Sequence, residues 1–230
     1  MPARQRGVEI LDDPATDPAL RARSIRDVAR SNVLLGGARA VLAELARLLP
    51  ALGASATLLD VGIGQADIPR KARARARANG VTLRTFGLDE AESLVRAAGD
   101  TLDGSLCGDA RRLPIGNASV DVVTCSQLLH HFEEDEIVVV LRELDRVARG
   151  WVVVSDLRRS WLAAWGFWLV SWPLGFHKVT RHDGFLSVLR GFTVDELARH
   201  VLAATGQQPE VRRRLGYRIT ATWRPRQPTS

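Results

Sequence analysis

Short apolar runs alternate along most of the chain with longer segments in which apolar residues recur at helical spacing. The runs predict β-strands and the longer segments predict helices, because each pattern places the apolar side chains on a surface that can be buried. Predicted strands cover residues 57–61, 82–88, 104–107, 120–126 and 151–155. Helices are predicted up to Asn79–Gly80, from Glu90 onward, and from about Glu133 to Ala148. This alternation is typical of a parallel sheet with helices on both faces.

The two ends of the chain add helices and a hairpin to this pattern. Two helices precede the first strand, around residues 20–28 and 41–48, and a capping box at Thr193–Glu196 begins a last helix. Residues 211–215 and 217–223 predict two short strands, which would place an antiparallel strand at or near the sheet edge. We therefore expect an α/β fold with a Rossmann-like, seven-stranded, mostly parallel sheet, an antiparallel C-terminal strand and a helical cap.

Composition and charge indicate one globular domain in a reducing compartment. The 230 residues are 46% hydrophobic and 25% charged, and a net charge of +6 comes from arginines scattered along the chain, a pattern typical of a solvated surface. Cys107 and Cys125 fall on predicted strands that are not neighbours, so no disulfide is expected and the cytoplasm is the predicted location. The N-terminus lacks a secretory signal pattern, and the apolar run 161–176 is too short to span a bilayer.

The first predicted strand leads into a glycine turn that opens a helix. Asp60 precedes Gly62 and Gly64 in this turn. Glycines let a ligand approach the backbone and the positive helix end closely. A buried carboxylate ahead of the first glycine would repel phosphate and attract an ammonium group, which favours S-adenosylmethionine over a dinucleotide.

Polar residues follow the other predicted parallel strands as well. In such a sheet, ligands lie at the carboxyl ends of the strands. Any one of these residues has a simpler explanation as a helix cap or turn residue, but their joint occurrence favours a cofactor site. The candidates along this edge are Asp60, Gly62, Gly64, Asp67, Asp89, Asp109, Ala110 and Ser126.

Over roughly residues 57–154 the chain resembles class I S-adenosylmethionine-dependent methyltransferases, most nearly the small-molecule branch that includes ubiquinone, menaquinone and polyketide methyltransferases. The family's glycine motif corresponds to Asp60–Ala66, with Ala66 in place of the usual third glycine. The resemblance implies that Asp60 anchors the ammonium group of the cofactor while Gly62 and Gly64 contact its methionine part. It also implies that Asp89 binds the ribose and that Asp109, beside Ala110, binds the adenine amino group.

From the length, the composition and this resemblance we expect a single methyltransferase domain over residues 1–230. Within it we expect an N-terminal helical cap at 1–50, a cofactor-binding core at 51–156, an aromatic-rich cap insert at 157–190, and the last helix with the C-terminal strands at 191–224.

A nicotinamide dinucleotide enzyme is the alternative for the glycine turn, because Asp89 also fits ribose recognition. Asp67 stands where a dinucleotide motif has glycine, and Asp60 stands where it usually has an apolar residue. Both residues count against the dinucleotide.

Three histidines are candidates for the base that removes a proton from a hydroxyl acceptor. His130 and His131 follow the fourth strand, and His182 lies next to Asp183 in a predicted loop. Local packing is the simpler explanation for each of them. Asp156 and Arg158, after the fifth strand, are candidates to contact the acceptor, with a helix cap and a solvated arginine as alternatives.

Four tryptophans at positions 161, 165, 168 and 172 have the spacing of one helical face. They predict core packing, a lid over an aromatic or lipophilic acceptor that would involve Trp165 and Trp168, or a helix lying at a membrane surface.

Residues 126–129 read Ser-Gln-Leu-Leu, without the Asn/Asp-Pro-Pro-aromatic motif of enzymes that methylate base or glutamine nitrogens, so no nucleic-acid partner is expected. We predict O-methylation of a small aromatic, quinone-like or polyketide-like molecule. C-methylation of a phenol ring and a non-catalytic membrane- or partner-binding protein are the alternatives. No metal site is predicted, because no ligand set with recognisable spacing is visible. The oligomeric state stays open.

Overall fold

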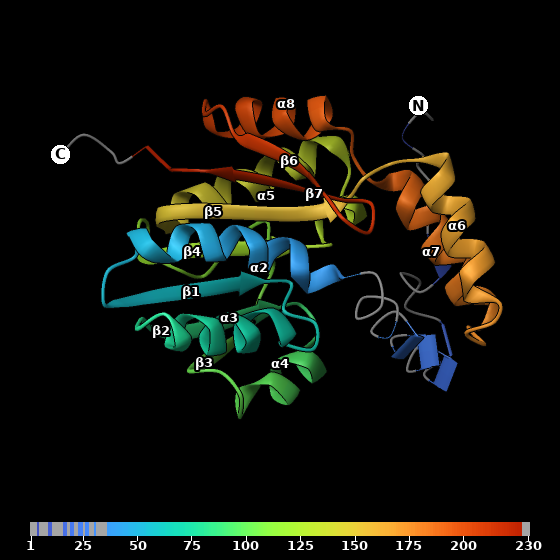
Figure 1. Ribbon diagram of the computed structural model, residues 1–230, viewed down its shortest axis with the longest axis horizontal. Coiled ribbons are helices and arrows are strands. Elements are labelled where there is room, and N and C mark those ends of the chain that lie inside the picture. The colour runs from blue at the N-terminus through green and yellow to red at the C-terminus, as the bar shows by residue number, and fades with distance from the viewer. Residues whose placement is uncertain are drawn as a thin grey trace.

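A seven-stranded sheet with the order β3-β2-β1-β4-β5-β7-β6 forms the centre of the computed structural model (Figure 1). The structure describes residues 4, 9, 10, 16, 17, 19, 20, 23, 24, 26, 27, 30 and 36–226. The strands are β1 (Ser55–Val61), β2 (Thr82–Asp89), β3 (Gly104–Cys107), β4 (Val120–Ser126), β5 (Ala148–Leu157), β6 (Glu210–Arg214) and β7 (Arg218–Trp223). The helices are α2 (Gly37–Leu48), α3 (Asp67–Ala78), α4 (Glu92–Gly99), α5 (Glu134–Val147), α6 (Trp161–Ser171), α7 (Lys178–Arg190) and α8 (Val194–Thr205), with short 3₁₀ helices η2 (Leu49–Ala51) and η3 (Leu129–His131).

The strand directions confirm the predicted fold class. Strands β1 to β5 are parallel, whereas β7 runs antiparallel to both β5 and the edge strand β6. The chain builds the sheet outward from β1 to β3 and then returns to place β4 on the other side of β1. Ligands of open α/β sheets bind at such a reversal, at the carboxyl ends of the strands.

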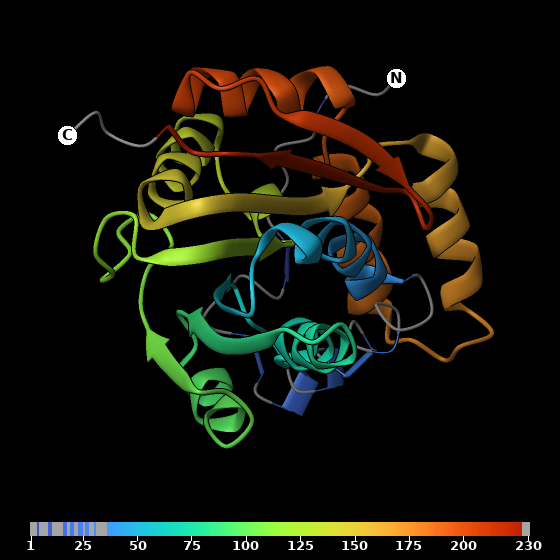
Figure 2. The same ribbon diagram turned by 60° about the vertical axis from the view of Figure 1, so that its left-hand side comes forward.

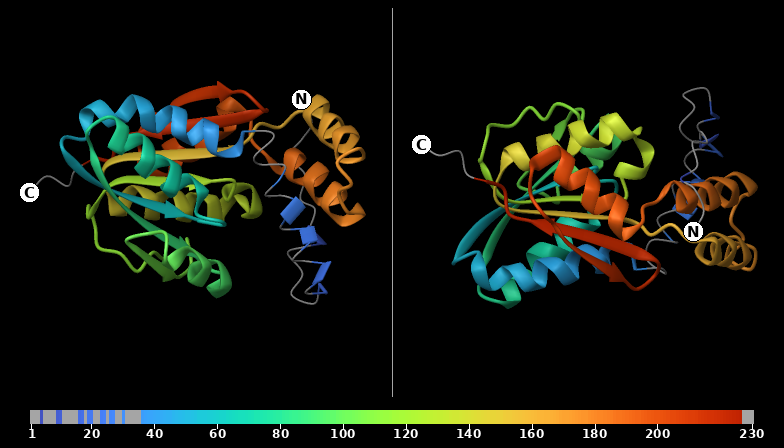
Figure 3. Two further views of the ribbon diagram at one scale, coloured as in Figure 1. Left: turned by 60° about the horizontal axis from the view of Figure 1, so that its bottom comes forward. Right: turned by 90° about the horizontal axis from the view of Figure 1, so that it is seen from above.

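Helices cover both faces of the twisted sheet (Figure 2). Helices α2 and α3 pack with β1 and β2 in one buried apolar cluster, and α5 and α8 pack with β4, β5 and β7 in another. The right view of Figure 3 shows α2 and α5 on opposite sides of the sheet. Because both faces are covered, the central strands are apolar almost throughout, which is why they appear as continuous runs in the sequence.

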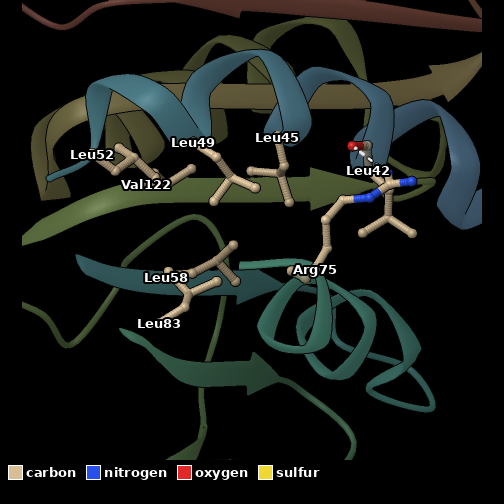
Figure 4. A pocket seen from close by; sticks show the side chains of 9 residues that line it. Leu42, Leu45, Leu49, Leu52, Leu58, Arg75, Leu83 and Val122 are labelled. Carbon is tan, nitrogen blue, oxygen red and sulfur yellow. Dashed lines mark hydrogen bonds between the residues drawn. The ribbon is translucent and has the colours of Figure 1, made fainter. Parts of the chain in front are cut away.

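One cavity in the described structure is a packing gap in the core. It has a volume of about 10 Å³ and lies between α2, α3 and the sheet. The Arg75 side chain crosses its edge, and the Arg75 Nη1 donates to the Leu42 carbonyl at 3.1 Å (Figure 4). It has room for no more than about one water molecule, so it is no ligand site.

Helices α6 and α7 form a hairpin at the end of the molecule toward which β1 and β5 point (Figures 1 and 3). The prediction of a loop around His182 and Asp183 is wrong, because both residues lie within α7. His177 caps this helix through its side chain, which accepts from the Val179 N–H. A Cβ at Gly184 would stand 2.2 Å from Phe167 Cε1, so only a glycine lets α6 approach α7 so closely. No helix among the described residues is long and apolar enough to cross a membrane.

In the predicted helix around residues 20–28, the described residues 20, 23, 24, 26 and 27 are helical and the others lie outside the described residues. The helix around 41–48 is confirmed as α2. The described N-terminal residues contact α7: Asp27 Oδ2 accepts from the His177 N–H at 3.1 Å, and the Ile10 N–H donates to Asp183 Oδ1 at 3.1 Å. Cys107 and Cys125 are free thiols on β3 and β4, which are not neighbours.

Candidate functional site

The glycine turn after β1 is held by the end of β2 and leaves one face open. The N–H groups of Gly62 and Ile63 both donate to the Leu88 carbonyl, at 2.8 and 3.2 Å. Gly62 and Gly64 have positive φ angles of 76° and 50°, a region that favours glycine. A Cβ at Gly62 would lie 3.1 Å from Leu128 Cδ2, whereas one at Gly64 would meet no atom within 4 Å. The Gly64 backbone is therefore accessible to a ligand.

Ala66, at the position of the usual third glycine, also adopts a left-handed conformation, with φ of 53°. It is buried against Ile63 and the α4 side of the molecule. The motif thus keeps the glycine-type backbone although its third glycine is missing.

Asp60 presents a buried carboxylate with one unsatisfied oxygen. Thr124 Oγ1 donates to Asp60 Oδ1 at 2.6 Å, whereas Asp60 Oδ2 is buried and has no hydrogen-bond partner. Burial, and secondarily the negative charges of Asp67 and Asp89, raises the pKa of Asp60 to about 8. A cationic group placed beside Oδ2 would relieve this penalty, whereas a phosphate would increase it.

Asp89 and Asp67 stand around the same turn but have different partners. Asp89 Oδ2 accepts from the Gly64 N–H at 3.1 Å and Asp89 Oδ1 accepts from the Ala91 N–H at 3.0 Å. Asp67 begins α3 and pairs with Lys71 at 2.7 Å. Asp89 therefore holds the glycine turn in shape and keeps lone pairs available for hydroxyl donors.

The predicted cofactor-binding residues that follow β3 or end β4 differ in how accessible they are to a ligand. These residues are Asp109, Ala110 and Ser126. The Arg111 side chain hydrogen-bonds to Asp109, and this contact holds the pKa of Asp109 below its usual range. An amino group of a ligand would therefore share this carboxylate with Arg111. Ala110 is buried in the core, and Ser126 Oγ is buried without a hydrogen-bond partner.

His130 and Asp156 form a buried pair near the carboxyl ends of β4 and β5. His130 Nδ1 lies 2.6 Å from Asp156 Oδ1, and the His130 N–H donates to Asp156 Oδ2 at 3.3 Å. Burial acts to raise the pKa of Asp156, but the charge and hydrogen bond of His130 outweigh it and hold that pKa below its ordinary value. An ionised carboxylate only accepts, so Nδ1 donates to it, and in the neutral form of the imidazole the lone pair is on Nε2. Leu128, which packs over Gly62, is two residues from His130.

The sequence predicts Asp156 as a candidate for direct contact with the acceptor. It is fully buried at the end of β5, where its oxygens are used by His130 and the Leu157 N–H. The Asp156 side chain therefore lies in the interior of the protein, in contact with His130.

Two polar residues near Asp156 are absent from the sequence-based candidates. Arg218, buried at the start of β7, donates through Nη1 to Gln127 Oε1 at 2.6 Å. Burial lowers the pKa of Arg218 to about 10, and the charge of Asp156 opposes this decrease. Gln127 has a φ of 56°, an uncommon conformation that often occurs at functional sites. The available signal in the sequence was a single charged residue, Arg218, in the otherwise uncharged predicted strand 217–223.

Two further side chains that could bind a ligand, those of His131 and Glu9, lie close to His130. The rings of His130 and His131 are 4.2 Å apart, and one ligand atom from each of Glu9, His130 and His131 lies within 4.8 Å of the others. Three such donors are a possible metal-ligand set, which the sequence did not predict. However, Arg190 Nη1 lies 3.6 Å from Glu9 Oε1. The positive charge of the guanidinium at this distance disfavours the binding of a divalent cation.

The remaining predicted site residues lie around the α6–α7 hairpin. His182 pairs with Asp183 at 2.9 Å and is exposed. Together with Trp165 and Trp168 it lines a groove of about 610 Å³ between α6 and α7. Arg158 stacks over Tyr217, with 5.0 Å between its Cζ and the ring centre. Trp165, Trp168 and His182 thus share the α6–α7 groove, whereas Arg158 is not among the residues that line it.

Comparison with known proteins agrees with this geometry. Residues 59–154 match the family model of the methyltransferase domain. The match and the site together indicate a methyltransferase that uses S-adenosylmethionine as its cofactor. No curated protein sequence matches the chain.

Solved structures support the fold of this methyltransferase at low sequence identity. The plantazolicin methyltransferase BpumL, in complex with SAH, has a TM-score of 0.67 at 12% identity, over 92% of each chain. The S-adenosylmethionine-dependent methyltransferase SibL has a TM-score of 0.64 at 16% identity, over 96% of this chain and 64% of SibL. A putative O-methyltransferase from Nostoc punctiforme has a TM-score of 0.55 at 15% identity, over 94% of this chain and 71% of that one.

Proposed function

We propose that this methyltransferase transfers a methyl group to a hydroxyl of a small aromatic, quinone-like or polyketide-like molecule, with His130 as the base and Asp156 as its positioning residue. The observation that carries the proposal is the buried His130–Asp156 pair, 2.6 Å apart, two residues from the leucine that packs over the glycine turn.

The residues around the turn fit a cofactor with an ammonium group. When bound, S-adenosylmethionine supplies an electrophilic methyl group on a sulfonium centre. Asp60, through its unsatisfied Oδ2, would hold the ammonium, and the open Gly64 backbone would lie against the methionine part. Asp89 would accept from the ribose hydroxyls with its remaining lone pairs. A pyrophosphate would instead meet Asp60, Asp67 and Asp89, which argues against a dinucleotide.

His130 is suited to remove the acceptor proton. With Nδ1 donating to Asp156, the Nε2 lone pair is available, and the ionised Asp156 would stabilise the imidazolium that forms. Burial also excludes water that would compete for the proton. His182, exposed on α7 and paired with Asp183, is the weaker candidate because it lies in the α6–α7 groove.

Three variants separate this base from its alternatives. His130→Gln should retain the affinity for S-adenosylmethionine and lower kcat by about 10²- to 10⁴-fold, the usual contribution of a general base. Asp156→Asn should lower kcat and move the acidic limb of the pH–kcat profile to lower pH, because the imidazolium loses its counter-charge. His182→Gln should leave turnover unchanged.

The assay follows methyl transfer to a panel of phenols and quinols by mass spectrometry, with cofactor affinity measured by calorimetry. Unchanged turnover in His130→Gln would remove the histidine from the mechanism. Loss of turnover only in His182→Gln would transfer the role to that residue.

Two alternatives differ from this proposal in observable ways. Methylation of a ring carbon uses the same base and is recognised by the position of the new methyl group in the NMR spectrum of the product. A non-catalytic protein that retains the fold would fail to bind S-adenosylmethionine or would bind it without turnover on any acceptor.

A further inference from the structure

Helix α6 is exposed to solvent although its sequence is almost entirely apolar. Its inner side packs on α7 through Ala163 and Ala164, which are buried with Val188 and Leu189. The rest of the helix and its C-cap carry more than half of the large hydrophobic side chains that are exposed in the described structure. These are Trp161, Leu162, Trp165, Leu169, Val170 and Trp172, with exposed fractions from 47% to 71%. We call this set of side chains the α6 face.

Core packing was one of the three predictions for the tryptophans. It is wrong for Trp161, Trp165 and Trp172, because about half of each of these side chains is exposed. The indoles of Trp165, Trp168 and Trp172 pack edge to face on one another, at centroid distances of 5.7 Å, and Trp165 contacts Phe185 of α7. They line the open groove and leave the α6 face in contact with solvent. An apolar exposed area of this extent on one short helix marks an interaction site.

The charges along residues 157–182 are positive, whereas Asp27 and Asp183, which contact α7 or lie in it, are buried. Residues 157–182 contain no aspartate or glutamate but four cations. Of these, Arg159 is buried and paired with Glu196, whereas Lys178 and Arg181 line the groove beside the indoles. The Arg181 guanidinium stacks on Trp172 at 3.9 Å from the ring centre. Tryptophans beside cations are the side chains that hold proteins at the headgroup level of a bilayer.

These charges decide between two possible occupants of the face. In a symmetric dimer the same patch meets itself, so Lys178 and Arg181 would be brought against a patch whose exposed charges are also cations, because Asp27 and Asp183 are buried. An anionic bilayer supplies apolar chains for the α6 face and phosphates for the cations. At 11 residues, α6 is about half the length needed to span the hydrocarbon core, so it would lie in the plane of the interface.

We propose that the α6 face docks the protein on the surface of an anionic phospholipid bilayer, with Trp161, Trp165 and Trp172 at the interface and Lys178 and Arg181 on the phosphates. The hairpin lies at the same end of the molecule as the carboxyl ends of β1 and β5 (Figure 1), so docking would bring the cofactor site close to a lipophilic acceptor. Vesicle binding itself requires neither the cofactor nor the proposed acceptor, and its test is independent of the proposed function.

The test uses flotation of the full chain with vesicles of phosphatidylcholine, alone or mixed with phosphatidylglycerol, together with quenching of tryptophan fluorescence by brominated lipids. The wild type should bind the anionic vesicles and lose binding as salt is added. Leu162→Glu/Leu169→Glu should weaken binding at least about tenfold, because charges replace inserted apolar groups. Lys178→Ala/Arg181→Ala should weaken binding to anionic vesicles by about 25-fold, roughly fivefold for each cation.

Leu202→Glu is the matched control, because Leu202 is a half-exposed leucine on α8. It should bind vesicles as the wild type does, and all variants should share the wild-type unfolding midpoint. Absence of wild-type binding to anionic vesicles, or equal loss in Leu202→Glu, would overturn the proposal. Concentration-dependent dimerisation that Leu162→Glu/Leu169→Glu abolishes, without any vesicle binding, would assign the α6 face to a second copy of the chain.

Discussion

Replacing Asp60 with asparagine should make the ligand-free protein more stable and the cofactor complex weaker. Asparagine has nearly the same shape as protonated aspartate and can still accept from Thr124 Oγ1, which lies 2.6 Å from Oδ1. It carries no charge to be buried beside Asp67 and Asp89. The substitution thus removes a destabilising charge and, with it, the proposed partner of the ammonium group.

The expected difference in the free energy of unfolding follows from the pKa of Asp60, which burial raises from 3.8 to about 8. Because the folded state binds this proton more tightly than the unfolded state, the wild type is favoured at low pH and loses stability as the pH rises toward 8. Each pH unit in this range corresponds to about 1.4 kcal/mol. Between pH 5 and pH 7.5, the wild type should therefore lose about 3 kcal/mol relative to Asp60→Asn.

Urea unfolding of both proteins across this pH range measures the difference, since the titration of all other groups cancels to first order. Calorimetry adds an independent test: at pH 7, S-adenosylmethionine should release close to one proton from the wild type and none from Asp60→Asn. A difference in stability that does not change with pH would show that Asp60 is ionised in the ligand-free protein and would refute this reasoning.

Three further predictions concern the metal, the sheet and the core. Treatment with EDTA should leave turnover unchanged, and loss of activity that a divalent cation restores would instead make the cluster around Glu9 a metal site. Gly150→Ala should lower the free energy of unfolding by about 1–3 kcal/mol, because its Cβ would stand 2.5 Å from the Asp121 carbonyl oxygen; an unchanged urea midpoint would contradict this. Glu44→Ala should cost about 1–3 kcal/mol in the same assay, because the buried Thr220 hydroxyl loses its acceptor at 2.6 Å and the partly exposed Arg214 loses its partner; an unchanged free energy of unfolding would contradict it.

The sheet could be predicted because its strands are buried on both faces, which makes them appear as apolar runs separated by turn residues. Because the strands could be located, the edge of the sheet that carries the candidate site could also be predicted. Asp60, Asp89 and Ser126 each stand at or next to the carboxyl end of a parallel strand. Local signals such as the capping box at Thr193 and Glu196 were equally reliable, because they depend on neighbours in the chain.

Contacts between distant residues could not be predicted in this way. His130 and Asp156 are 26 positions apart, and neither residue alone indicates that their side chains meet. The contact of Arg111 with Asp109 depends on the loop conformation after β3. The tryptophan spacing correctly predicts one helical face, but periodicity does not determine which side of a hairpin is covered. Here α7 packs on the alanine side of α6 and leaves the indoles exposed.

Calorimetric titration of the purified protein with S-adenosylmethionine, S-adenosylhomocysteine and NADH, repeated on Asp60→Asn, tests the central claim most directly. The account predicts that both adenosyl compounds carrying the ammonium group bind the wild type, that both bind the variant more weakly, and that NADH binds neither protein. Binding of NADH alone, or of none of the three ligands, would contradict the assignment of this site to S-adenosylmethionine.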